Sequence, residues 1–428
     1  ADTNKKPDRP STPATTAKPD RKRAPEVSRP ATTRPPGDTQ ADKPARTPNT
    51  KSVGTPDAAG SPDNQKTRWR NPNVRRQPPN DPPVVRSNPD TGPNPIFSGK
   101  RPQSVSESNL RNLEQLKAQR KKVVAPRGNA VVIKEPDQRT IVKRDNKAFI
   151  VHNESNRLRR APNSRTEKQG RNNVTVIQRP NNVQIYNITD SSGHLVRRYR
   201  RDADGRETIL IDNESRRRKS RWGRNLAIGL GIGAGIVAGA AILNAAVDVP
   251  PPRVAIPRDK YIVDYEYADD DDVYEAFSAP PVDRIERRYT LDEVRATPQL
   301  RERMRRVDLS DITFDTGSWE VSEGQYSKLE RAARGLLRVI ERNPNEIFMV
   351  EGYTDAVGSE EDNLSLSDRR AETVAVILSE EFGVPAENLT TQGYGEEYLK
   401  VPTEGPERLN RRVAIRRITP LISQDERR

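Results

Sequence analysis

The stretch from residue 347 to residue 382 reads IFMVEGYTDAVGSEEDNLSLSDRRAETVAVILSEEF and predicts a strand, a loop and a helix. The apolar run at residues 347–351 is typical of a buried strand, and Gly352 ends it. The polar residues that follow predict a loop. Beyond the loop, apolar side chains recur at helical spacing and form one arc of a long amphipathic helix: Leu366, Ala371, Val374, Ile377, Leu378 and Phe382.

The charged residues of this helix divide between two faces. Asp368, Arg369 and Glu372 fall opposite the apolar arc, so we expect them to face solvent. Arg370 breaks the pattern, because it lies one helical turn after Leu366 and therefore points inward. A buried guanidinium is costly unless it meets a carboxylate. Arg370 is then either half of a structural ion pair or a ligand-binding residue at the end of a strand-loop-helix unit, where open α/β sheets commonly bind ligands.

The motifs of this stretch also resemble a known family. The pattern G-Y-T-D-x-x-G-S at residues 352–359, followed by N-x-x-L-S-x-x-R-A at residues 363–371, resembles the OmpA-like peptidoglycan-binding domain. The segments ITFD at residues 312–315 and NRRVAI at residues 410–415 extend the resemblance. It implies an α/β fold, in which helices pack on one mixed β-sheet, and we place this domain at residues 307–420.

The rest of this domain is predicted from local patterns. Apolar residues at helical spacing indicate a helix that Asn343 and Pro344 terminate. The predicted elements in chain order are a strand at 309–314, a helix at 323–342, the strand and helix described above, a strand at 389–392 and a strand at 412–418.

The polar residues at the start of the second helix suit a zwitterionic ligand. Asp355 lies in the loop after the strand, and Arg370 points inward from the helix, so the two can hold an ammonium and a carboxylate of one small group. The resemblance implies that this group is meso-diaminopimelate of the peptidoglycan stem peptide. It also implies that Asn363 binds an anion at the helix start. The remaining expected site residues are Thr354 beside Asp355 and, as pocket rim, Asp315, Thr316 and Arg411. The alternative for Asp355 is a turn-capping role.

The composition of the whole chain argues against a core throughout its length. The chain has 428 residues, a net charge of +14, 37 prolines and 32% hydrophobic residues. We therefore predict a disordered, Pro-rich, basic arm at residues 1–103. The Ala at position 1 is consistent with a removed signal peptide.

The sequence offers no catalytic constellation. Cysteine is absent, which excludes disulfides, thiolate chemistry and a lipid-modified N-terminal Cys. The two histidines, His152 and His194, cannot form a His-rich metal site. We therefore expect a protein that is not an enzyme and that has neither a cofactor nor a metal.

Residues 104–224 predict a small β-rich accessory region. A short polar helix at residues 104–121 opens it. The segment 129–136 then resembles 173–180, and Ile141 corresponds to Ile185 at the same spacing, which indicates an imperfect repeat. The second copy carries an insert with turns at 191–193 and 204–205. The core of such an antiparallel meander is thin, so an accessory role is favoured over an independent domain.

A Gly-rich segment at residues 225–248 follows a run of arginines. Its uncharged stretch, residues 226–247, is long enough to span a bilayer as a helix. Gly231, Gly235 and Gly239 recur at every fourth position and would let two such helices approach closely, giving a homo-oligomer. A flexible or soluble Gly/Ala hinge is the alternative.

Residues 249–306 are expected to be a linker. Its acidic run at 264–272 lacks the spacing and the glycine of an EF-hand, so contacts with basic segments of the chain itself are favoured over a calcium site. Helical residues at 291–304, interrupted near Pro298, then lead into the C-terminal domain.

Together these features predict a non-enzymatic envelope protein that binds peptidoglycan and tethers a membrane to the cell wall. A flagellar-stator-like membrane component is an alternative, but residues 226–247 hold no carboxylate for proton conduction. The basic N-terminal half offers a further alternative, because it would attract anionic lipid, lipopolysaccharide or nucleic acid. Nucleic acid is the least favoured of these, since no recognition motif is readable.

The expected location is the Gram-negative cell envelope. We favour the outer membrane, with the C-terminal domain in the periplasm. The basic residues before position 226 support the alternative of an inner-membrane protein with a cytoplasmic N-terminus.

Overall fold

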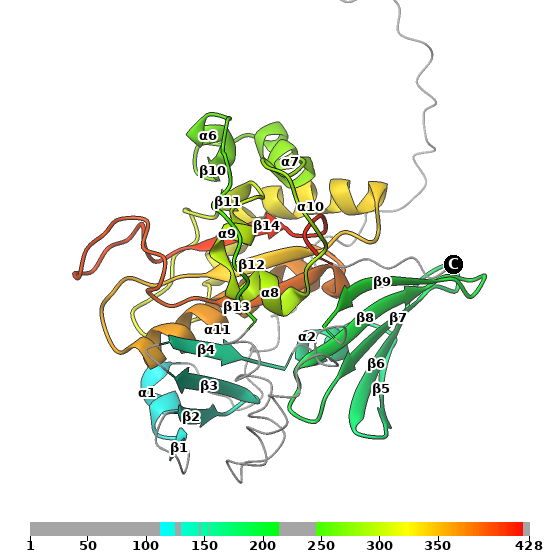
Figure 1. Cartoon of the computed structure of the whole chain (residues 1–428), viewed down its shortest axis with the longest axis horizontal. Helices are drawn as coiled ribbons and strands as arrows, with labels where there is room; N and C mark the ends of the chain where they lie inside the picture. Colours follow the sequence, from blue (N-terminus) through cyan, green and yellow to red (C-terminus); the bar gives the residue numbers. More distant parts are fainter. Residues whose placement is uncertain (1–111, 125–129, 145–146, 154, 214–244, 423–428) are drawn as a thin grey trace, which may run out of the picture. The chain divides into compact units, whose positions relative to one another are not determined.

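A computed structural model describes residues 112–124, 130–144, 147–153, 155–213 and 245–422 (Figure 1). The predicted arm at 1–103 and most of the predicted membrane segment lie outside these residues. The C-terminal part is built on one mixed sheet, which confirms the α/β fold. Its strand order is β10-β11-β14-β12-β13, with β10 Ile262–Asp264, β11 Arg306–Asp308, β14 Val413–Arg417, β12 Phe348–Gly352 and β13 Leu389–Gly393.

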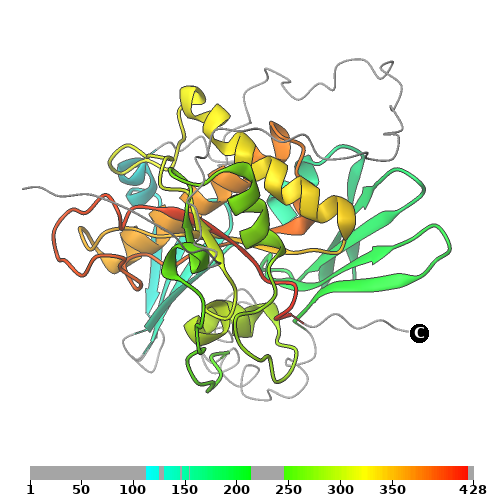
Figure 2. The ribbon, with the colours of Figure 1, turned by 90° about the horizontal axis from the view of Figure 1, so that it is seen from above.

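Two helices cover one face of this sheet. They are α10 (Glu330–Arg342), which continues a 3-10 helix η1 (Glu323–Leu329), and α11 (Glu360–Glu380). Both predicted helices are therefore present. The apolar arc of α11 packs with the sheet in the main core, where Val374, Leu378 and Phe348 are buried. Figure 2 shows a further helix, α7 (Asp270–Ser278), lying beside α10.

Three of the four predicted strands of this domain are found, and the first one is displaced. The strand predicted at residues 309–314 is instead β11, which ends at Asp308. Beyond it, Leu309 still donates its backbone N–H to Val413, but Ile312 bonds back to Leu309 and closes a turn. Ser310 donates its hydroxyl to Asp264 from the neighbouring strand. The turn bond from Ile312 uses the carbonyl of Leu309, and the chain therefore leaves the strand at this point.

The opposite face of the sheet is covered by residues that were expected to be a linker. Ile347 and Met349 pack there against the short helices α8 (Leu291–Ala296) and α9 (Pro298–Arg301). The interruption predicted near Pro298 falls between these two helices. The segment 249–306 also supplies α6 (Arg258–Tyr261), β10 and α7, so it is part of the fold.

The acidic run within that segment contacts basic side chains of α10, as its charge suggested. Asp270 pairs with Arg334 at 3.0 Å, and Asp271 pairs with Arg338 at 3.2 Å. Asp269 and Asp272 form a capping box at the start of α7. The acidic residues therefore both start a helix and hold it on its neighbour.

Two glycines let α11 lie directly on the sheet. Gly352 ends β12 and Gly393 ends β13, and both sit under the first half of the helix. A Cβ on Gly352 would lie 1.9 Å from the backbone oxygen of Ser367, and one on Gly393 would lie 2.3 Å from the backbone nitrogen of Asp368. Because these obstacles are backbone atoms, a side chain at either position would force the helix away from the strands.

The substitution Gly352→Ala is expected to destabilise the domain by about 1–3 kcal/mol, because the added methyl group overpacks a helix–sheet contact. Urea denaturation compared with wild type measures this loss. Gly324→Ala is the matched control, since a Cβ there meets no atom within 4 Å. Equal stability of Gly352→Ala and wild type would contradict the close approach.

The N-terminal part forms two antiparallel meanders. The first is a four-stranded sheet of β1 (Lys121–Val124), β2 (Ala130–Glu135), β3 (Arg139–Arg144) and β4 (Lys147–Val151). The second is a five-stranded sheet of β5 (Ser164–Gln169), β6 (Asn172–Gln178), β7 (Gln184–Thr189), β8 (Leu195–Arg201) and β9 (Glu207–Asp212). Short helices α1 (Leu113–Lys117) and α2 (Ser155–Arg160) accompany them.

The imperfect repeat corresponds to two hairpins. The first copy is β2–β3 and the second is β6–β7. The two turns match as well: Asp137 and Gln138 both have positive φ, and so do Asn181 and Asn182. The insert of the second copy is β9 and the turn that leads to it. The repeat read from the sequence is thus a repeated hairpin with the same turn.

Both meanders bury their apolar faces on the C-terminal domain. Ile141 and Ile150 of the first sheet pack with Leu364 of α11. Leu158 and Ile177 pack with Ala386, which lies in the 3-10 helix η2 (Ala386–Asn388). In Figure 1, β4 lies directly beneath α11. Helix α11 is therefore covered on two sides, by its own sheet and by β3 and β4.

This second layer overturns the expectation that Asp368, Arg369 and Glu372 face solvent. All three are buried, and Arg369 is 0% exposed. Their side chains meet charged residues of the N-terminal sheet. The helix face that looked like a solvent face is an interface made of ion pairs.

Of the predicted membrane segment, the structure describes only the end, residues 245–248. Residues 226–244 lie outside the described residues. Ala245 is buried, and Val247 donates its backbone N–H to Thr297 at 3.1 Å without being part of a helix. Among the helices that the structure describes, none combines the length and the apolar character needed to cross a bilayer.

Candidate functional site

The loop after β12 carries Thr354 and Asp355 to the edge of the sheet. Thr354 donates its backbone N–H to the carbonyl of Gly395 at 2.9 Å, which joins this loop to the loop after β13. Asp355 is 7% exposed, and its Oδ2 accepts from Arg411 Nη1 at 2.6 Å and from the backbone N–H of Glu407 at 3.3 Å. Asp355 is therefore a buried carboxylate with a neighbouring cation, and the loop around residues 407–411 closes over it.

Arg370 lies at the middle of α11 and points inward, as its spacing predicted. It is 3% exposed, and its Nε donates to the carbonyl of Ser318 at 3.0 Å. Nη2 lies 3.4 Å from the carbonyl of Asp315, and the guanidinium stacks 4.9 Å from the centre of the Phe314 ring. No carboxylate of the described residues forms an ion pair with Arg370. The structural ion pair considered from the sequence is thus not seen in this part of the chain.

Arg370 nevertheless carries its charge at neutral pH. Burial and the nearby cation of Arg411 lower the pKa of Arg370 to about 10, and Asp355 raises it in part. A buried cation whose partners are neutral carbonyls is incompletely compensated. An anionic group placed beside it would gain a charge-assisted hydrogen bond.

Thr354 adds a second incompletely satisfied group. Its side chain is buried, and its Oγ1 has no hydrogen-bond partner among the described residues. A buried hydroxyl without a partner is costly, and such groups mark places where a water or a ligand can bind. Thr354 and Asp355 are adjacent in the chain, so the unsatisfied hydroxyl lies next to the buried carboxylate.

Asn363 lies beside the site, but its backbone N–H and its side-chain amide are both already hydrogen-bonded. Its backbone N–H bonds to the carbonyl of Ser359 at 2.9 Å, within the helix. Its side-chain Nδ2 donates to Glu396 Oε2 at 2.5 Å. The expected anion contact would have to compete with a carboxylate, so the structure favours a role for Asn363 in holding the 394–398 loop against α11.

The loop that carries two of the predicted rim residues, Asp315 and Thr316, is held by an element outside the OmpA-like domain. Asp315 and Thr316 are exposed on the loop after β11. The same loop contains Trp319, which is buried against Leu116 of α1 and Leu366 of α11. The backbone N–H of Leu113 also bonds to Gly317 at 2.9 Å. The sequence did not reveal this contact, because α1 is short and polar.

The first turn of α11 is acidic and is neutralised by basic residues of the N-terminal part, one of which lies in β3. Lys143 pairs with Glu360 and Glu361, both at 2.8 Å. Asp362 pairs with Lys117 and with Arg120. The helix start therefore presents paired carboxylates next to the site, which reduces repulsion of an anionic ligand.

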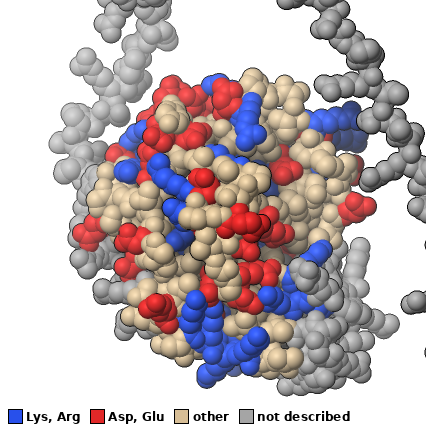
Figure 3. Space-filling model, turned by 90° about the vertical axis from the view of Figure 1, so that its left-hand side faces the viewer, with Lys and Arg blue, Asp and Glu red and all other residues tan. Residues whose placement is uncertain are grey.

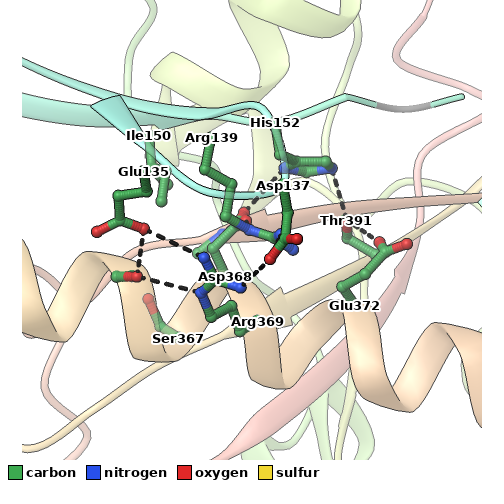
Figure 4. A network of polar contacts seen from close by, with 12 residues as sticks. Glu135, Asp137, Arg139, Ile150, His152, Ser367, Asp368, Arg369, Glu372 and Thr391 are labelled. Carbon is green, nitrogen blue, oxygen red and sulfur yellow. Dashed lines mark hydrogen bonds and ion pairs between the residues drawn. The ribbon is translucent and has the colours of Figure 1, made fainter. Parts of the chain in front are cut away.

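A buried polar network joins α11 to the first sheet (Figure 4). Asp368 is fully buried, and it pairs with Arg139 at 3.0 Å and with His152 Nδ1 at 3.0 Å. On the next position of the helix, Arg369 pairs with Asp137 at 2.8 Å and lies 3.5 Å from Glu135.

One turn further along, Glu372 continues this network. It pairs with Arg157 at 2.6 Å and accepts from the hydroxyl of Thr391 at 2.9 Å. The hydroxyl of Thr391 also meets His152 Nε2 at 3.0 Å. The charged face of α11 is thus occupied by structural partners and does not contribute a free binding surface.

The mixed sheet with α10 and α11 on one face is consistent with the OmpA-like fold that the motifs implied. Residues 313–412 match the model of the OmpA family, which confirms the resemblance predicted from the motifs. The chain is 36% identical over 91 residues to outer membrane porin F of Pseudomonas aeruginosa, which covers 21% of this chain and 25% of that protein. It is 38% identical over 92 residues to the peptidoglycan-associated lipoprotein of Agrobacterium fabrum, covering 21% of this chain and 49% of that protein.

A solved structure gives a similar match. The peptidoglycan-associated lipoprotein from Burkholderia pseudomallei is 28% identical, with a TM-score of 0.22, and the match covers 25% of this chain and 87% of that chain. This chain therefore spans about a quarter and about half of the two curated relatives named above. The matched part of this chain is its OmpA-like domain.

Proposed function

We propose that this protein is a non-enzymatic envelope protein that binds peptidoglycan through meso-diaminopimelate. The observation that carries the proposal is Arg370, a buried guanidinium that has only neutral partners among the described residues and lies near the buried carboxylate of Asp355. Such a pair suits a ligand that bears a carboxylate and an ammonium on one carbon. The name of one relative, a peptidoglycan-associated lipoprotein, supports peptidoglycan as the ligand.

In the proposed binding mode, the ligand forms hydrogen bonds and ion pairs with Arg370, Asp355 and Thr354. The ligand carboxylate accepts from Arg370, and the ligand ammonium donates to Asp355. Arg411 forms an ion pair with Asp355 in the free protein. The side chain of Arg411 is 37% exposed, so it can move toward solvent when the ligand ammonium binds Asp355. The hydroxyl of Thr354 supplies one more hydrogen bond. Asp315 and Thr316 would contact the ligand from the exposed rim.

The proposed role is to tether a membrane to the cell wall. The relatives include an outer membrane porin, which supports a Gram-negative envelope location, and we favour the outer membrane with the OmpA-like domain in the periplasm. Residues 226–244 would provide the membrane contact, without residues 245–247, which pack on the domain, and Gly231, Gly235 and Gly239 would allow self-association. Anionic lipid or lipopolysaccharide would bind the basic arm.

The described surface gives less support to nucleic acid as a partner. Figure 3 shows one face, on which acidic and basic side chains are interspersed, with one cluster of basic side chains toward the lower end. A nucleic-acid interface favours a continuous basic surface.

Retention on purified sacculi tests the proposal. The full chain is expected to sediment with diaminopimelate-type peptidoglycan and not with lysine-type peptidoglycan, because lysine lacks the carboxylate that Arg370 would bind. Free meso-diaminopimelate should release the protein, while free lysine should not. Equal retention on both wall types, or retention on neither, would reject diaminopimelate recognition.

A further inference from the structure

A cavity is lined in part by the 394–398 loop, which also contacts residues of the Asp355–Arg370 site. Its volume is about 460 Å³, which is within the range of small-molecule sites. From the OmpA-like domain it is lined by Leu364 of α11 and by Tyr394 and Tyr398 of that loop. We call it the Tyr398 pocket.

The other walls of the Tyr398 pocket come from segments outside residues 313–412. Lys147 and Phe149 come from β4, Ala246 from the segment before α6, and Thr297 and Gln299 from the α8–α9 region. The pocket therefore exists because the N-terminal sheet and residues 245–301 pack on the OmpA-like domain. It is a feature of this chain and not of the matched family segment.

The Tyr398 pocket and the Asp355–Arg370 site share one wall. Asn363 of the site donates to Glu396, which lines the pocket. Thr354 of the site bonds to Gly395, which adjoins the pocket residues Tyr394 and Glu396. The 394–398 loop and the first turns of α11 contact both places, so we expect a single extended ligand to reach both.

The lining suits a neutral, hydroxyl-rich ring. Phe149, Leu364 and Tyr398 give apolar surface, against which the apolar face of a pyranose packs. Glu396 and Glu397 accept hydrogen bonds from hydroxyl groups, and Gln299 and Lys147 donate to an acetamido oxygen. The carboxylates Glu360, Glu396 and Glu397 outnumber the lining cations Lys147 and Arg295, which disfavours a phosphate or another strongly anionic ligand. The polar groups disfavour an acyl chain.

We propose that the Tyr398 pocket binds an N-acetylated amino sugar of the glycan strand while the Asp355–Arg370 site holds the stem peptide. This inference rests on the proposed peptidoglycan function. In peptidoglycan the sugar is joined to diaminopimelate through two amino-acid residues and a lactyl group. At ~3.3–3.6 Å per extended residue, this connection can cross one loop.

The test compares two soluble ligands by calorimetry with the full chain. One is the tripeptide L-Ala-γ-D-Glu-meso-diaminopimelate, and the other is the same tripeptide on the GlcNAc–MurNAc disaccharide. The disaccharide is expected to raise affinity roughly tenfold, through one ring contact and one or two hydrogen bonds. Equal affinity of the two ligands would overturn the sugar site and leave diaminopimelate binding intact. Failure of both ligands to bind would reject the peptidoglycan proposal itself and this inference with it.

Two variants test whether the affinity gained from the disaccharide arises in the Tyr398 pocket. Ala246→Trp fills the pocket from an exposed position and should remove the gain from the disaccharide without changing tripeptide affinity. Asp248→Trp is the matched control, because this exposed residue does not line the pocket. Glu397→Gln removes one acceptor charge from an exposed side chain and should reduce the gain severalfold without threatening the fold. A full disaccharide gain in both Ala246→Trp and Glu397→Gln would overturn the assignment.

Discussion

Arg370→Ala is expected to abolish retention on diaminopimelate-type peptidoglycan. The substitution removes the donor for the ligand carboxylate and leaves that carboxylate unpaired in a buried site, which costs roughly 2–5 kcal/mol of binding free energy. This loss corresponds to a thirtyfold or larger rise in Kd, on the order of 1.4 kcal/mol per factor of ten. Asp355→Asn should lose binding for the complementary reason, because an amide of the same size cannot compensate the ligand ammonium. Calorimetry with the stem tripeptide measures both losses.

The control for this prediction must be an arginine outside the site. Arg369 is unsuitable, although the sequence placed it on the outer face, because it is buried against Asp137. Arg338→Ala is the better control, since this side chain is half-exposed and contacts Asp271 and the ring of Tyr274 on α7, outside the site. Arg370 itself holds no carboxylate among the described residues, so Arg370→Ala should keep its circular dichroism spectrum. A folded Asp355→Asn, Arg370→Ala double variant that binds the wall normally would contradict the site.

The sequence predicted the sheet and its helices well because their cores are apolar and periodic. The same periodicity placed Arg370 correctly, since one helical turn separates it from Leu366 on the buried arc. The glycines at the ends of β12 and β13 were seen only as strand breaks. Their close approach to α11 depends on three-dimensional packing that no local pattern expresses.

The charged face of α11 shows why the packing of the N-terminal sheet on this helix could not be predicted. A helix face lined by Asp368, Arg369 and Glu372 has the same pattern whether water or a second charged surface covers it. The partners lie more than two hundred residues earlier in the chain, in β-strands with their own mixture of charges. Only the pairing of the two surfaces identifies the interface, and hydrophobic periodicity does not report ion pairs.

Short elements were missed for a related reason. The strand β10 has three residues and lies beside an acidic run, so composition indicated a linker. Its place in the sheet depends on parallel pairing with β11, in which Val263 lies opposite Val307. A strand of this length carries too few residues to show an alternating pattern.

Asp368→Ala is expected to destabilise the protein by about 3–5 kcal/mol, because it removes the closest carboxylate from the buried charge of Arg139 and leaves only Asp137, at 3.9 Å, in an ion pair with it. Asp368 Oδ2 accepts from Arg139, and Oδ1 meets both His152 and the backbone N–H of Gly393. The loss is a large part of the stability of a typical domain, so this substitution should also loosen the N-terminal sheet from α11. Urea denaturation measures the free energy, and proteolysis of the β-rich region measures the loosening.

The pH dependence of stability gives an independent check on the same carboxylate. Burial alone would raise the pKa of Asp368, but the charges and hydrogen bonds of His152 and Arg139 hold it below the usual range. A folded-state pKa below the unfolded value of ~3.9 contributes stability above that pH, and the contribution is lost as the pH falls further. Wild type should therefore lose stability below about pH 4 more steeply than Asp368→Asn. Asp271→Ala is the control, since Asp271 is 88% exposed in its pair with Arg338 and should contribute little. If Asp368→Ala were no less stable than Asp271→Ala, the network would not hold the sheet on the helix.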